Sequence, residues 1–154
     1  MNKTALLQLI IDRLTIDLDV AQRAAQTAYE TATHEENVAE NKYDTLGLEA
    51  SYLATGQARR MEEIRQGLGK FQSLKLRETD GAVQLGSLVA LTSSQGVTQW
   101  FFLGPDAAGL KIDFQGVMVM VITPRSPLGG SLLGKRVDDE VVMGGTEQVI
   151  VEVV

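Results

Sequence analysis

The first fifth of the chain carries a regular apolar seam. Its members repeat at alternating steps of four and three residues: Leu7, Ile11, Leu14, Leu18, Ala21, Ala25, Ala28 and Ala32. This is the a/d spacing of a coiled-coil helix over nearly four heptads. The seam changes from leucine and isoleucine to alanine, and alanine lets a second helix approach closely. The spacing therefore predicts an amphipathic helix that packs along another helix and becomes thinner toward its end.

A second periodic stretch supplies the partner. Its apolar positions are less regular and include one glutamine: Leu46, Ala50, Leu53, Gln57, Met61, Ile64 and Leu68. Gly67 and Gly69 are candidate stop signals for this helix. About eight polar residues separate the two stretches, which favours an antiparallel coiled-coil hairpin with arms of ~28 residues, or about 40 Å. An ordinary helical bundle or a homodimeric coiled coil is the alternative.

The composition changes near residue 75. Beyond it Val, Gly and Thr dominate, and all three prolines lie there. We therefore place a boundary between an α part, 1–75, and a β part, 76–154. Short apolar runs bounded by Gly, Pro, Asp or Ser predict strands, and they cover residues 87–91, 98–103, 117–122, 140–143 and 148–153.

One short helix is expected inside the β part. Ser126 is a good N-cap, Pro127 suits the first helical position, and Gly134 can end the helix. The prediction is an α+β chain: a helical hairpin, then a small antiparallel sheet of about five strands holding one short helix. Its core is expected to contain Trp100, Phe101, Phe102 and Phe114.

The composition excludes several kinds of chemistry. The chain has no cysteine and a single histidine, His34, which excludes disulfides, thiol nucleophiles and nearly every structural zinc site. No apolar run approaches the ~18 residues of a membrane span, and the acidic residues near the N-terminus are not those of a signal peptide. A cytoplasmic protein without a membrane partner is the expectation. The net charge of −6 argues against a general nucleic-acid binder.

An acidic stretch is followed directly by a basic one. Residues 33–50 hold five acids and one lysine, and residues 51–77 hold six bases and two acids. Within 34–41, at the expected hairpin tip, Glu36 and Glu40 share one side if the segment is helical. Carboxylate oxygens on an exposed element suit Mg²⁺, although a solvated acidic turn has the same composition. Arg59 and Arg60, in the basic stretch, either face an anionic partner or pair with Glu62, Glu63 or the first arm.

The segment 123–141 resembles a known family. It reads Thr-Pro-Arg-Ser126-Pro127-Leu128, then Leu-Leu-Gly-Lys135, then Asp-Asp-Glu-Val141. With the hairpin and its acidic tip, this is similar to the GreA/GreB transcript-cleavage factors of bacterial RNA polymerase. The similarity is strongest over 121–154 and moderate over 33–60, where Ala39-Glu40-Asn41, then Gly56-Gln57 and Arg59-Arg60, echo the family's second arm.

The resemblance implies a fold and a function. It implies that 76–154 is an FKBP-like domain that binds RNA polymerase at its secondary channel, through Ser126, Pro127 and Leu128. The hairpin 1–75 would reach the active centre, where Glu36 and Glu40 would share a Mg²⁺ ion with the polymerase and stimulate cleavage of backtracked RNA. Arg59 and Arg60 would face that RNA. The chain would then hold no cofactor tightly and would act in trans without being an enzyme itself.

The tip departs from the family pattern. Aligning on Glu40-Asn41 leaves Asn37 at the position of a metal-binding aspartate, and Glu36 is the nearest substitute. An amide oxygen is a weaker ligand than a carboxylate for a divalent ion. A regulator that binds the secondary channel without stimulating cleavage is therefore a second hypothesis. A free-standing FKBP-like isomerase or chaperone with an oligomerising coiled coil is a third.

Overall fold

The computed structural model describes residues 1–34 and 45–154, with side chains from residue 48 onward in the second range. The chain divides into two compact units. One combines Met1–Ile11 with Gly69–Val154, and the other is Asp12–Leu68. The first residues of the N-terminal helix and the last residues of the second helix therefore belong to the same unit as the sheet. The predicted division into domains at residues 75 and 76 stays a prediction.

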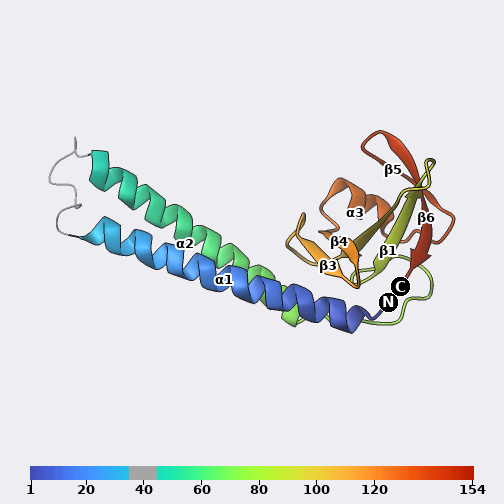
Figure 1. The fold of residues 1–154 in the computed structure, drawn as a ribbon, viewed down its shortest axis with the longest axis horizontal. Helices are drawn as coiled ribbons and strands as arrows, with labels where there is room; N and C mark the ends of the chain where they lie inside the picture. The colour runs from blue at the N-terminus through green and yellow to red at the C-terminus, as the bar shows by residue number, and fades with distance from the viewer. Residues whose placement is uncertain (35–44) are drawn as a thin grey trace. The chain divides into compact units, whose positions relative to one another are not determined.

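Two long helices form the hairpin (Figure 1). Helix α1 spans Lys3–Thr33 and α2 spans Thr45–Gln72, and they run antiparallel, side by side. In the seam Leu14, Ala21 and Ala28 are buried, as is Leu68 of α2. Leu53 is an exception because 56% of its surface is exposed. The predicted hairpin is confirmed.

The predicted end of the second helix is wrong. Helix α2 passes through Gly67 and Gly69 and ends only at Gln72. Each glycine in a helix interior costs about 1 kcal/mol relative to alanine. Burial of the complete Phe71 side chain in the last turn contributes about 1.5–3 kcal/mol, which offsets the combined cost of about 2 kcal/mol for the two glycines. Tertiary packing therefore decides where this helix stops.

The base of the hairpin is a second packing centre. Leu6 and Ile10 of α1 are fully buried, like Phe71, although the heptad seam predicts Leu7 and Ile11 at this end. Leu7 and Ile11 are only partly buried. The apolar face thus widens at the base, because the helix here packs in the unit that contains the sheet.

The sheet has six strands in the order β3-β4-β2-β1-β6-β5. The strands are β1 Leu88–Ser93, β2 Thr98–Leu103, β3 Lys111–Phe114, β4 Val117–Ile122, β5 Glu140–Met143 and β6 Thr146–Val153. Helix α3, Pro127–Leu132, follows β4. The predicted α+β class, a helical hairpin followed by a β domain with one short helix, is confirmed.

Two details of the predicted sheet are wrong. Strand β3 was not expected, and β2 pairs with β4 in parallel, with Trp100 opposite Val119 and Leu103 opposite Ile122. Both errors have one cause. Strand β3 reverses the chain after β2, and the β3–β4 hairpin reverses it again, so β4 returns in the direction of β2. At four residues, β3 is too short to give a strong periodic signal.

Both faces of the sheet are covered. On one face Val89, Leu91, Phe101 and Ile150 pack with Leu132 of α3. Residues of the opposite alternation are also buried, and these include Leu88, Phe102, Val119 and Val121. Phe101, Phe102 and Phe114 are buried as predicted, whereas Trp100 is only partly buried.

Gly129 is required by the packing of α3. A Cβ atom added there would lie 1.9 Å from the Thr123 carbonyl oxygen. We expect Gly129→Ala to lower the free energy of unfolding by about 2 kcal/mol or more, because backbone must move to relieve the overlap. Gly56→Ala is the matched control: its Cβ would meet nothing within 4 Å, so it should gain about 0.5–1 kcal/mol. Urea unfolding followed by circular dichroism measures both, and a Gly129→Ala protein as stable as wild type would contradict this packing.

Candidate functional site

The turn before α3 is held by the Ser126 side chain. Its Oγ donates to the Thr123 carbonyl oxygen at 2.6 Å and accepts from the N–H groups of Gly129 at 3.2 Å and Thr123 at 3.3 Å. Ser126 is extended, with φ −74° and ψ 150°, and Pro127 begins the helix. This is the N-cap arrangement that satisfies an orphan helical donor. The predicted cap is confirmed.

The three residues of the predicted docking turn differ in exposure. Pro127 is exposed, whereas Ser126 and Leu128 are partly buried. Leu128 also packs against the core on the α3 side of the sheet. Two of the three side chains therefore hold the turn in place, and docking through all three stays a prediction. Pro127 and its exposed neighbours Pro124 and Arg125 are the accessible surface.

Basic residues lie along the second half of α2. Arg59 and Arg60 are exposed, and no carboxylate of a described residue forms an ion pair with either. Arg65, one to two turns further along, pairs with Glu62 at 2.7 Å. Of the two roles left open for Arg59 and Arg60, pairing with glutamates on their own helix is therefore not seen among the described side chains.

Glu36 and Glu40, with Asn37 between them, lie outside the described residues. Within residues 1–34 and 45–154 no group of three or more His, Cys, Asp or Glu side chains is arranged to hold a metal ion. The same described helices include none that is long and apolar enough to cross a membrane. The metal-sharing role of the tip therefore stays a prediction.

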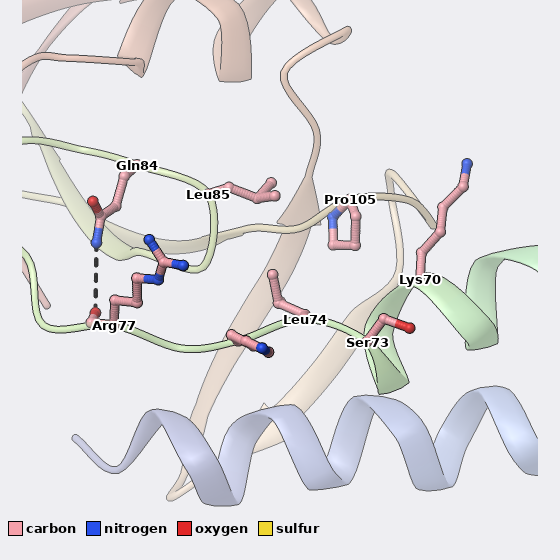
Figure 2. Close-up of a pocket in the computed structure, with 8 residues that line it drawn as sticks. Lys70, Ser73, Leu74, Arg77, Gln84, Leu85 and Pro105 are labelled. Carbon is pink, nitrogen blue, oxygen red and sulfur yellow. Dashed lines mark hydrogen bonds between the residues drawn. The ribbon is translucent and has the colours of Figure 1, made fainter.

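A cleft that sequence reasoning missed opens beside the end of α2 (Figure 2). It has a volume of about 590 Å³, and Lys70, Lys75 and Arg77 line it together with Leu74, Leu85 and Pro105. These residues come from the last turn of α2, the connection after it, and the loops that flank β1 and β2. They lie up to 35 positions apart in the chain, so no local motif marks the site. The run of bases in 51–77 was the only available signal.

Asp106 interacts both with Lys70 of the cleft and with Arg125 in the turn before α3. Its carboxylate accepts from the Lys70 ammonium at 3.1 Å and from the Ala107 N–H at 2.6 Å. Burial acts to raise the pKa of Asp106, but these two hydrogen bonds and the positive charges of Lys70 and Arg125 outweigh it, and the pKa is lowered. Asp106 is therefore ionised at neutral pH and offsets part of the positive charge on this side of the cleft.

The comparisons with known proteins are limited to solved structures. No protein-family model matches the chain, and no curated protein matches it. The chain is similar to GreA factor homolog 1 (Gfh1) of Thermus thermophilus, with 21% identity over 93% of each chain and a TM-score of 0.38. It is similar to Gfh1 of Thermus aquaticus, with 21% identity over 92% of each chain and a TM-score of 0.37. The GreA/GreB elongation factor of Nitrosomonas europaea shares 20% identity over 62% of this chain and 90% of its own, with a TM-score of 0.34.

The N-cap gives a direct test of what Ser126 does. Ser126→Ala should lower the free energy of unfolding by about 1–2 kcal/mol, because the N–H of Gly129 loses its acceptor. Ser126→Thr keeps both the acceptor for Gly129 and the donor to the Thr123 carbonyl oxygen, so it should recover most of this loss. Ser131→Ala is the control: Ser131 is exposed, so the change should stay within about 0.5 kcal/mol. If Ser126→Ala were as stable as the control in thermal and urea unfolding, the cap would not stabilise the turn.

Proposed function

We propose that this protein is a bacterial transcription elongation factor that binds RNA polymerase at its secondary channel and stimulates Mg²⁺-dependent cleavage of backtracked RNA. The observation that carries the proposal is a combination within one chain. A long antiparallel hairpin precedes a β domain whose only helix among the described residues, α3, begins at the Ser126-Pro127 cap. The segment that resembles the GreA/GreB family therefore forms the capped turn and the short helix of the β domain.

The hairpin suits a probe that enters a narrow passage. Its helices contain 31 and 28 residues, which correspond to about 40 Å at 1.5 Å per residue. The buried seam positions are Leu14 near the base and Ala21 and Ala28 beyond it. Alanine adds little side-chain bulk to the distal half of the arm, which suits a narrow passage.

Glu36 and Glu40 are the residues that we propose to act at the polymerase active centre. Carboxylate oxygens fit Mg²⁺, which accepts one or two protein carboxylates and completes its shell with water or phosphate. When bound, the ion supplies an activated water and stabilises charge during phosphodiester hydrolysis. The chain would contribute ligands to a shared ion and leave the rest of the catalytic site to the polymerase. On this proposal it is a factor that acts in trans and holds no cofactor tightly.

A regulator that occupies the channel without stimulating cleavage is the second candidate. Asn37 favours it, because a neutral amide stands where the family has an aspartate, and the affinity of the tip for Mg²⁺ falls accordingly. Both candidates share the same partner and the same docking mode. They differ only in what the tip does.

The two candidates are separated by RNA 3′-end cleavage in stalled elongation complexes. Native protein should accelerate Mg²⁺-dependent cleavage, Glu40→Ala should remove about tenfold or more of that acceleration, and Asn37→Asp should increase it by supplying a second carboxylate. Glu49→Ala, an exposed change on α2, serves as the control. If native protein and Asn37→Asp both bind polymerase and neither accelerates cleavage, the non-cleaving regulator replaces the first proposal.

We also propose that Arg59 and Arg60 face the backtracked RNA. Both are exposed, and neither is paired with a described carboxylate. Replacing both with alanine should reduce the salt dependence of RNA-linked binding by about 0.7 in logarithmic slope per arginine. Arg65→Ala is the matched control, because Arg65 is engaged with Glu62. An unchanged salt response in crosslinking to the RNA 3′ end would overturn this role.

A further inference from the structure

The basic cleft has two kinds of lining, apolar and cationic. Figure 2 shows Leu74, Leu85 and Pro105 around one open space, with the Arg77 side chain at its edge. Leu85 is 40% exposed, which leaves apolar surface available beside the basic side chains of the cleft. Its volume of about 590 Å³ falls within the usual range for ligand sites.

The positive charge of the cleft is only partly neutralised. Lys70 is paired with Asp106 at 3.1 Å. No carboxylate of a described residue forms an ion pair with Lys75 or Arg77. Lys3 adds a further cation nearby, since its Nζ donates to the Arg77 carbonyl oxygen at 3.3 Å. The cleft is thus a local cationic surface on a chain whose net charge is −6.

The loop that presents Leu85 is held before any partner binds. The N–H of Gln84 donates to Ser87 Oγ at 3.0 Å, and Ser87 is fully buried. The N–H of Gly86 donates to the Leu103 carbonyl oxygen at 2.7 Å, with Gly86 at φ +91°, where a side chain would be strained. A partner would therefore lose little free energy in ordering this loop.

We infer that the cleft docks a protein segment that carries carboxylates around an apolar side chain. The apolar group would cover Leu74, Leu85 and Pro105 while the carboxylates face Lys75 and Arg77. An RNA or DNA backbone offers negative charge but no aliphatic side chain to cover Leu74, Leu85 and Pro105. The chemistry therefore favours an acidic peptide. If the proposed function holds, the segment belongs to RNA polymerase, and the inference rests on that function only for the identity of the partner.

The chemistry of the cleft is tested without polymerase. The probes are a synthetic peptide of alternating Glu and Leu residues and a uridine decanucleotide, each added to the isotopically labelled full-length chain and followed by NMR. The peptide should shift the amide signals of Leu74, Leu85 and Asp106, and Lys75→Glu should weaken its binding by about tenfold. Shifts caused by the uridine decanucleotide alone, or no shifts in the cleft with either probe, would overturn the inference.

The partner is tested by binding to RNA polymerase. Two cleft variants, Lys75→Glu and Leu85→Ser, should each weaken binding by about tenfold or more. Their matched controls are Lys111→Glu on β3 and Val97→Ser between β1 and β2, both exposed in the described structure. Wild-type affinity of both cleft variants would overturn RNA polymerase as the partner of the cleft while the proposed function stands. Peptide binding in the cleft without polymerase binding by the wild-type chain would support the inference and overturn the proposed function instead.

Discussion

The contact between Phe71 and Gly104 is the point on which the unit with the sheet depends. Phe71 lies in the last turn of α2 and is fully buried. Gly104 directly follows β2, and a Cβ atom there would lie 2.9 Å from the Phe71 ring. Only glycine lets the ring reach the sheet. This contact carries α2 past two glycines and fixes the start of the segment that returns to β1.

Several features depend on this anchor. Phe71 and the fully buried Leu6 and Ile10 of α1 belong to the same compact unit as the strands. A Cβ atom at Gly104 would also lie 3.3 Å from Val121, so Phe71 lies near the buried residues on the sheet face that α3 does not cover. One turn of α2 therefore places Phe71 in the core and Lys70 at the rim of the cleft. The packing of the fold and the lining of the candidate docking surface have a common origin.

The sequence was informative where structure is periodic and local. The alternating steps from Leu7 to Ala32 predicted α1, and the Ser126-Pro127 pair predicted the start of α3, because each signal lies within a few turns of its own helix. The end of α2 and the parallel pairing of β2 with β4 depend on contacts between distant segments. Propensity at Gly67 and Gly69 favoured a stop, and burial of the Phe71 ring offset that preference.

The candidate sites follow the same rule. Acidic and basic stretches could be read from the chain, but the cleft joins Lys70, Leu85 and Pro105 from three separate segments, and only the fold brings them together. Conversely, Ser126 and Leu128 stood out in the sequence as docking residues, yet their side chains contribute to the cap and the core. A family signature can mark a residue because it shapes a surface rather than because it touches the partner.

This distinction changes how docking should be understood here. Asp106 accepts a hydrogen bond from Lys70 and also feels the charge of Arg125, so the cleft and the turn before α3 are electrostatic neighbours. A partner that reached from the cleft to this turn would meet Arg125 and Pro127, which are exposed, while Ser126 holds the turn in shape. Removing the cap would then weaken docking through the geometry of the turn, whereas reversing a cleft charge would weaken it directly and with a strong salt dependence. Salt dependence is thus the property that separates residues that build the surface from residues that bind through it.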